Sequence, residues 1–199
     1  MKKTILTLLS IVLSYVGLCQ EQSYINLEQN ISFKIPSDWT FDENNPNPII
    51  FEAHNKPERT SFIIAVEPKI CKNLWEALDT NRLEIENIFT TIMLPPGETT
   101  TEPLIIEKVE FGYRGKALRG QLEHLTDNEG FYENTRIMWI VGRDNKIYYF
   151  GLSIPTEEYN NNKDFFDNFY QRISFFINIE ENENGDLPDL RNLLCTGCE

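Results

Sequence analysis

The chain has 199 residues, of which 18 are lysine or arginine and 31 are aspartate or glutamate, and its net charge at neutral pH is −13. An acidic chain without a basic cluster is a poor match for nucleic acid or anionic lipid, because it offers few cations to replace their counterions. The sequence therefore predicts no nucleic-acid partner, and its length suffices for one domain with a sizeable core.

The N-terminal segment MKKTILTLLSIVLSYVGLCQ joins two lysines, Lys2 and Lys3, to an apolar stretch from Ile5 to Val16. The stretch is shorter than the ~20 residues that a membrane-spanning helix needs, and small residues follow it. This pattern predicts a secretory signal peptide over residues 1–19, removed by cleavage before Gln20. We therefore expect an exported protein, periplasmic or secreted, that is not inserted in a membrane after cleavage.

The cysteine at the cleavage point allows an alternative, an envelope lipoprotein anchored through Cys19. Leu18 disfavours it, because the residue before a lipid-modified cysteine is normally small. Lipidation of Cys19 therefore stays the second interpretation of this segment. Removal of the signal takes away two lysines and no acidic residue, which leaves 16 basic and 31 acidic residues and a net charge near −15.

Alternating apolar residues predict two pairs of strands at the start of the mature chain. The stretch YINLEQNISFKI, residues 24–35, indicates a hairpin with one buried face. It ends at Pro36, which cannot donate a ladder hydrogen bond, and Trp39 is expected to turn back toward the core. The stretches PIIFEAH and TSFIIAVEP, residues 48–54 and 60–68, predict the second pair.

The apolar spacing then changes to every three or four residues, which predicts a helix from Asn73 that the run Pro95–Gly97 terminates. Its apolar face comprises Leu74, Leu78, Ile85, Ile88, Phe89 and Ile92. Four strands near residues 103–112, 115–125, 130–141 and 146–154 follow. Their short polar links require antiparallel neighbours.

A second helix is predicted from Thr156 to about Asn178, with Phe166, Phe169, Ile173 and Phe176 on one face. The order of elements indicates a single α+β domain over residues 20–178, in which an antiparallel sheet carries helices against its faces. The residues predicted to form its core are Trp39, Phe62, Leu78, Ile85, Trp139, Phe150, Phe166 and Phe169.

Three stretches, ISFKIPSDWT, GKALRGQLEHL and IYYFGLSIPTEEYNNNKDFFDNFYQRISFF, resemble the PsbP-like fold family. This family takes in the photosystem II extrinsic subunit, the eukaryotic Ran-release factor and DcrB-like bacterial envelope proteins. The resemblance spans roughly Tyr24 to Asn178, with landmarks at Ile35, Pro36, Trp39, Ser174 and Phe175 that specify packing. It implies an α/β/α sandwich and an accessory or binding role, and it carries over no catalytic residue. The export signal excludes a Ran-directed role, and a photosystem role would need a photosynthetic host and the binding termini of that subunit, so the expected branch is that of the envelope proteins.

Residues that could carry chemistry are few. The two histidines, His54 and His124, lie in separate predicted strands. A lone strand histidine is usually structural, because a metal site or a nucleophile needs further partners. No Gly-x-Ser-x-Gly elbow exposes a serine, so we expect no catalytic residue, no metal and no cofactor.

Residues 179–199 are predicted to form an acidic linker and a tail that contains Cys195, Thr196, Gly197 and Cys198, followed by Glu199. Thr-Gly suits a type II turn, which brings the flanking cysteines close enough for a Cys195–Cys198 disulfide. A bridge from Cys71 to the tail is the rival pairing, and it would constrain the unfolded chain more.

The same two tail cysteines allow an alternative function, that of a thiol-disulfide enzyme. A redox pair normally lies between a strand and a helix of a βαβ unit, and no such unit precedes Cys195. The sequence therefore predicts an exported, non-enzymatic accessory or binding protein of the bacterial cell envelope. Its expected partner is an extracytoplasmic protein whose identity the residues do not specify.

Overall fold

The computed structural model describes residues 21–42, 45, 47–55, 57–68, 74–111, 115–127, 130, 132–143 and 146–175. In chain order the elements are β1 (Glu21–Asn26), β2 (Ile31–Pro36), β3 (Thr40–Asp42), β4 (Ile49–Asn55), β5 (Thr60–Pro68), α2 (Leu74–Thr80), α3 (Arg82–Met93), β6 (Glu98–Thr99), β7 (Ile105–Phe111), β8 (Gly115–Asp127), β9 (Glu133–Arg143), β10 (Lys146–Pro155), α4 (Thr156–Asn161), α5 (Lys163–Asp167), the 3-10 helix η1 (Phe169–Arg172) and β11 (Ile173–Phe175). None of the described helices is long and apolar enough to span a membrane.

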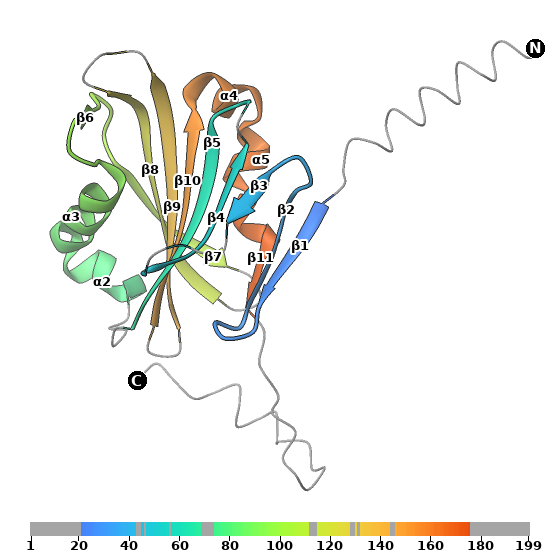
Figure 1. Cartoon of the computed structure of the whole chain (residues 1–199). Helices are drawn as coiled ribbons and strands as arrows, with labels where there is room; N and C mark the ends of the chain where they lie inside the picture. Colours follow the sequence, from blue (N-terminus) through green and yellow to red (C-terminus); the bar gives the residue numbers. More distant parts are fainter. Residues whose placement is uncertain are drawn as a thin grey trace, which may run out of the picture.

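Hydrogen bonding divides the described strands into two antiparallel sheets (Figure 1). The large sheet has eight strands in the order β3-β4-β5-β10-β9-β8-β6, and β7 also pairs with β8. The small sheet has the order β1-β2-β11, so the predicted N-terminal hairpin forms but does not join the large sheet. The α+β class and the antiparallel pairing are confirmed.

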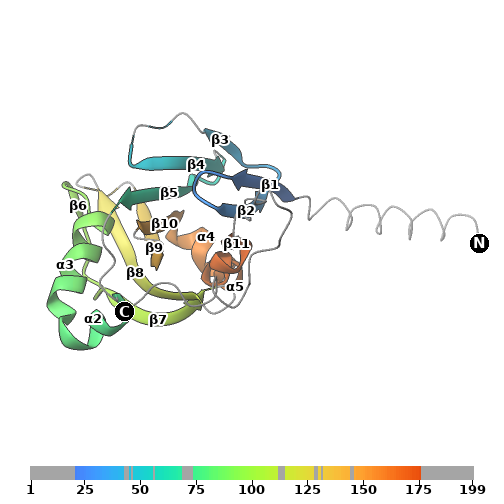
Figure 2. The same ribbon diagram turned by 90° about the horizontal axis from the view of Figure 1, so that it is seen from below.

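Apolar side chains cover both faces of the large sheet, because successive residues of a strand point to opposite faces. On one face α2 and α3 pack against β8, β9 and β10, and Phe89 and Met93 belong to one hydrophobic cluster with Leu118, Leu122 and Met138. The small sheet, α4, α5 and η1 cover the opposite face. Figure 2 shows the sheet between these two layers.

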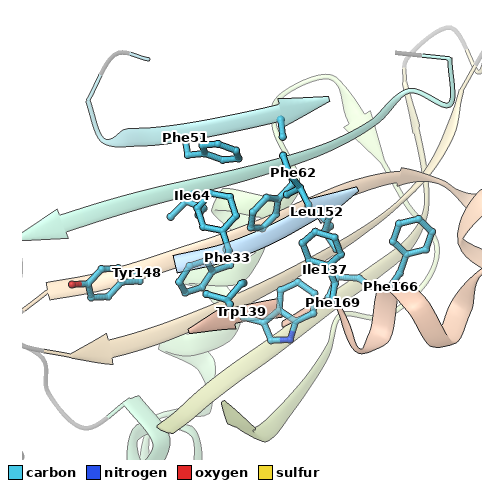
Figure 3. Packing of buried hydrophobic residues seen from close by; sticks show 14 of the residues in the cluster. Phe33, Phe51, Phe62, Ile64, Ile137, Trp139, Tyr148, Leu152, Phe166 and Phe169 are labelled. Atoms are coloured by element: carbon cyan, nitrogen blue, oxygen red, sulfur yellow. The ribbon is translucent and has the colours of Figure 1, made fainter. Parts of the chain in front are cut away.

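Aromatic rings fill the core under the small sheet. The centroid of the Phe33 ring lies 4.4 Å from that of Phe51, and the Phe62 centroid lies 5.0 Å from that of Phe169. Figure 3 shows these side chains converging from the two sheets and η1. Each such buried side chain stabilises the fold by ~1.5–3 kcal/mol. All eight residues predicted to form the core are buried, so that prediction is confirmed.

The first predicted helix is two helices, α2 and α3, which meet at Asn81. Asn81 has φ −144° and ψ 52°, so its backbone leaves the helix, and its carbonyl accepts the N–H of Glu84 to begin α3. The Asn81 side chain caps no backbone N–H and instead donates a hydrogen bond to the Glu84 carboxylate. The buried residues of α3 are Ile85, Phe89 and Met93, which follow one another at intervals of four, so Met93 is buried and Ile92 is 42% exposed.

The prediction of one continuous second helix is wrong, because its first helix, α4, ends at Asn161. The segment consists of α4, α5 and η1, and then becomes strand β11, which carries Ser174 and Phe175. Ile173 and Phe175 pair with Phe33 and Ile31, which places β11 on the free edge of β2. The pairing satisfies backbone groups that a helical turn would satisfy locally, and the helical spacing of the sequence does not distinguish the two.

Candidate functional site

A buried arginine lies on the face of β8 that α4 and α5 cover. Arg119 is only 7% exposed, and its guanidinium donates a hydrogen bond of 2.6 Å to Asp167 on α5. The same group also donates to the side-chain oxygen of Gln121 and lies 3.6 Å from a carboxylate oxygen of Glu107 on β7. A buried guanidinium persists only when it is paired, so these contacts determine where Asp167 and Gln121 lie.

A tyrosine hydroxyl connects the ion pair of Arg119 and Asp167 to a lysine. Tyr159 on α4 accepts hydrogen bonds from Lys163 at 2.6 Å and Gln121 at 3.0 Å, and donates one of 3.0 Å to Asp167. Lys163 also donates to the second carboxylate oxygen of Asp167. The Tyr159 hydroxyl therefore uses its one donor and both of its acceptor positions, and the network holds α4 and α5 against β8.

The lysine in this network is held in its charged form. Desolvation lowers the pKa of Lys163, but hydrogen bonds to Asp167 and Tyr159 outweigh it and leave the pKa above its ordinary value. A protonated lysine lacks the lone pair that a nucleophile or a general base needs. Lys163 can therefore bind and orient charged groups, but it is not an activated base.

An open groove of about 350 Å³ runs over this network. Ile105, Glu107 and Val109 of β7 form one side, and Asn168 and Tyr170 beyond α5 form the other. Arg119, Gln121 and Glu123 of β8 lie at its floor. The groove thus combines walls of mixed polarity, in which Ile105, Val109 and Tyr170 are the apolar members, with a floor whose charged groups are already positioned.

A second hollow of about 410 Å³ surrounds His124, and threonines form most of its wall. His124 has φ 52° at a β-bulge where β8 shifts register against β9 between Leu122 and Leu125. Its ring contacts the Glu133 carboxylate, and this hydrogen bond raises the pKa of His124 above its ordinary value. The hollow offers hydroxyls and one ion pair.

The other histidine is remote from this hollow. His54 lies on β4 and is 3.2 Å from Glu52, while β5, β10 and β9 separate β4 from the strand of His124. Within the described ranges no group of three or more histidine, cysteine, aspartate or glutamate residues is placed to hold a metal ion. Cys19, Cys71, Cys195 and Cys198 lie outside the described residues, so the disulfide and the lipidation site stay predictions.

The groove residues were not singled out from the sequence. In GKALRGQLEHL the apolar residues Leu118 and Leu122 alternate with Arg119, Gln121 and Glu123, which is the pattern of a strand with one solvated face. The sequence carries no signal that Arg119 is buried, and only the position of α5 shows that it is covered.

No family model matches the chain, and no curated protein matches its sequence significantly. Solved structures do resemble it. Cyanobacterial PsbP (CyanoP) from Synechocystis aligns with a TM-score of 0.56 at 15% identity, over 81% of this chain and 95% of the other. A structure from Bacteroides thetaiotaomicron aligns with a TM-score of 0.52 at 15% identity, over 80% of this chain and 50% of the other.

The Ran-binding protein Mog1p from Saccharomyces cerevisiae also aligns, with a TM-score of 0.50 at 10% identity over 78% of this chain and 95% of the other. At these identities the likeness describes the arrangement of the backbone and assigns no site. The resemblance predicted from the sequence is thereby confirmed at the level of architecture. The chain has the PsbP-like fold.

Proposed function

We propose that this protein is an exported, non-enzymatic accessory protein of the bacterial cell envelope that binds an extracytoplasmic protein in the groove formed by β7, β8 and α5. The observation that carries the proposal is Arg119, a buried cation at the groove floor that is already paired with Asp167 and Gln121. A floor fixed in this way does not have to be ordered when a partner binds, so less free energy is lost on association.

Two further observations support binding over catalysis. Hydrogen bonds to Asp167 and Tyr159 raise the pKa of Lys163, so this lysine does not provide a base at neutral pH. The Mog1p structure, which shares this fold, is that of a Ran-binding protein, so the fold is compatible with a protein-binding role. Turnover of a disulfide substrate that disappears in Cys195→Ser would overturn the non-enzymatic part of the proposal.

A matched pair of tryptophan substitutions tests the groove. Asn168→Trp places a large side chain at the groove wall, and Asn160→Trp makes the same change at an exposed position on α4 outside it. We expect tagged wild-type protein and Asn160→Trp to capture the same envelope protein, and Asn168→Trp to lose it. Equal capture by both variants would place the binding surface elsewhere, and capture by none would contradict the binding function.

The location is tested independently of the partner. Export predicts a mature protein that begins at Gln20 in the envelope or culture fraction, measured by intact-mass spectrometry after fractionation. A cytosolic protein of full length would contradict export. Palmitate labelling that is lost in Cys19→Ser would support the lipoprotein alternative instead.

A further inference from the structure

We propose that the occupant of the groove is an extended basic segment of the partner that adds to the large sheet as a new strand beside β7. This inference rests on the proposed function, because it uses the same groove, and it specifies the chemistry of the bound segment. Three features of the described residues carry it: an open strand edge, a side-chain groove beside that edge, and an exposed carboxylate in the groove.

The first feature is the outer edge of β7. All seven of its residues, from Ile105 to Phe111, pair in unbroken register with β8, from Gln121 to Gly115. β6 pairs with β8 farther along, at Thr126 and Asp127, so within the described part of the chain no strand occupies the other side of β7. Figure 2 shows β7 at the margin of the sheet.

Proteins usually protect such an edge with a proline, a bulge or an inward-pointing charge. β7 contains no proline and no register shift. Its one lysine, Lys108, is paired with Asp79 on the opposite face. The edge therefore presents backbone donors and acceptors in the regular spacing that an added strand needs.

The second feature is the position of the groove relative to this edge. Ile105, Glu107 and Val109 project from β7 into the groove, and the intervening residues face α2 and α3. Alternate side chains of a strand added beside β7 would lie on the groove side as well. Ile105, which is 44% exposed, offers an apolar contact there. Backbone pairing would supply affinity, and the groove would select the side chains.

The third feature is charge. The Glu107 side chain is 53% exposed and lies 3.6 Å from Arg119, beyond hydrogen-bond distance. Asp167, in contrast, has both carboxylate oxygens engaged by Arg119 and Lys163. Glu107 can therefore accept a hydrogen bond from a lysine or arginine of the added segment without breaking the network at the floor. The chain's net charge of −13 favours the approach of such a segment.

The test uses a labelled synthetic heptapeptide in which lysines alternate with valines, with binding to the full mature protein measured by fluorescence anisotropy. Two further peptides carry N-methyl groups on alternate residues, one on the lysines and the other on the valines. Methylation removes N–H donors but keeps every side chain. Because one set of donors faces β7 and the other faces solvent, we expect one methylated peptide to bind at least about tenfold more weakly and the other to bind nearly as the parent.

Protein variants test the charge. Glu107→Gln should weaken binding of the parent peptide about two- to fivefold. Glu110→Gln removes the same charge from the same strand but on the face opposite the groove, and should leave binding unchanged. Amide hydrogens of residues 105–111 should exchange more slowly in the complex, and a peptide with glutamates in place of the lysines should not bind.

Each other outcome overturns the inference. Equal loss or equal retention of binding by the two methylated peptides would exclude strand addition, and equal effects of the two glutamine variants would exclude the role of Glu107. If no peptide binds while Asn168→Trp still abolishes capture of the envelope protein, strand addition is wrong and the proposed function stands. If Asn168→Trp has no effect on capture, the proposed function itself fails.

Discussion

A glycine on β8 lets α3 approach the strand that carries the groove floor. A Cβ atom on Gly120 would lie 2.3 Å from Cδ1 and 2.4 Å from Cε1 of the Phe89 ring. Normal carbon contacts are about 3.5–4.0 Å, so in Gly120→Ala the ring would have to move by more than about 1 Å. Phe89 is fully buried among the side chains of β8 and β9, which leaves it little room.

The cost of this substitution is the cost of overpacking. Added methyl groups in a filled core destabilise by about 1–3 kcal/mol, and the short distance to a rigid ring places Gly120→Ala near the upper end. Gly120 is not among the described glycines with positive φ, which are Gly97 and Gly130, so backbone strain adds nothing. For a domain of this size we expect the melting temperature to fall by about 6–12 °C.

Urea denaturation followed by tryptophan fluorescence measures the change, and a second substitution isolates its cause. In a Phe89→Leu background the smaller side chain leaves space for the methyl group, so the penalty of Gly120→Ala should fall below about 1 kcal/mol. Gly151→Ala is the graded control, because its Cβ would lie 3.1 Å from the flexible side chain of Ile63. An equal penalty for Gly120→Ala in both backgrounds would refute the ring clash.

Three further predictions concern the network, the core and pH. Arg119→Leu removes the buried cation that is paired with Asp167 and should lower the free energy of unfolding, measured by chemical denaturation, by about 3 kcal/mol. An unchanged free energy of unfolding would show that the pair does not stabilise the fold. Phe169→Ala should cost about 3–5 kcal/mol by the same assay, and near-native stability would contradict its burial. Burial, and secondarily Glu67, raises the pKa of Tyr149 to about 12. Because its pKa in the unfolded chain is about 10, its contribution to stability is complete below pH 10 and is lost between pH 10 and 12. Urea titrations at pH 9 and pH 11 measure how far the free energy of unfolding falls between these two values. This fall should be smaller in Tyr149→Phe than in the wild type, and an equal fall would contradict the raised pKa of Tyr149.

Local patterns in the sequence were sufficient for much of the fold. The alternation of Ile31, Phe33 and Ile35 predicted a strand with one buried face, and all three residues are buried there. Trp139 and Phe150 were placed in the core on similar grounds. Such predictions succeed because the period of apolar residues along a chain records which face of a strand or helix is removed from water.

Only the tertiary structure decided the elements whose partners are distant in sequence. Ile173 continues the helical spacing of Phe166 and Phe169, but it begins a strand because β2, more than 130 residues earlier in the chain, has a free edge beside it. The break at Asn81 is a second case, because the apolar spacing continues across it while the backbone leaves the helix there and divides it into α2 and α3.

The floor of the groove is the clearest feature that depends on the tertiary structure. Arg119, Gln121 and Glu123 have the alternation of a solvated strand face, and their sequence context is the same whether that face is open or covered. Burial of Arg119 follows from the position of α5, which brings Asp167 within 2.6 Å of the guanidinium across 48 residues of chain. A short stretch of sequence shows how polar and apolar residues alternate. A buried charge, in contrast, is stabilised by partners that only the folded chain brings close to it.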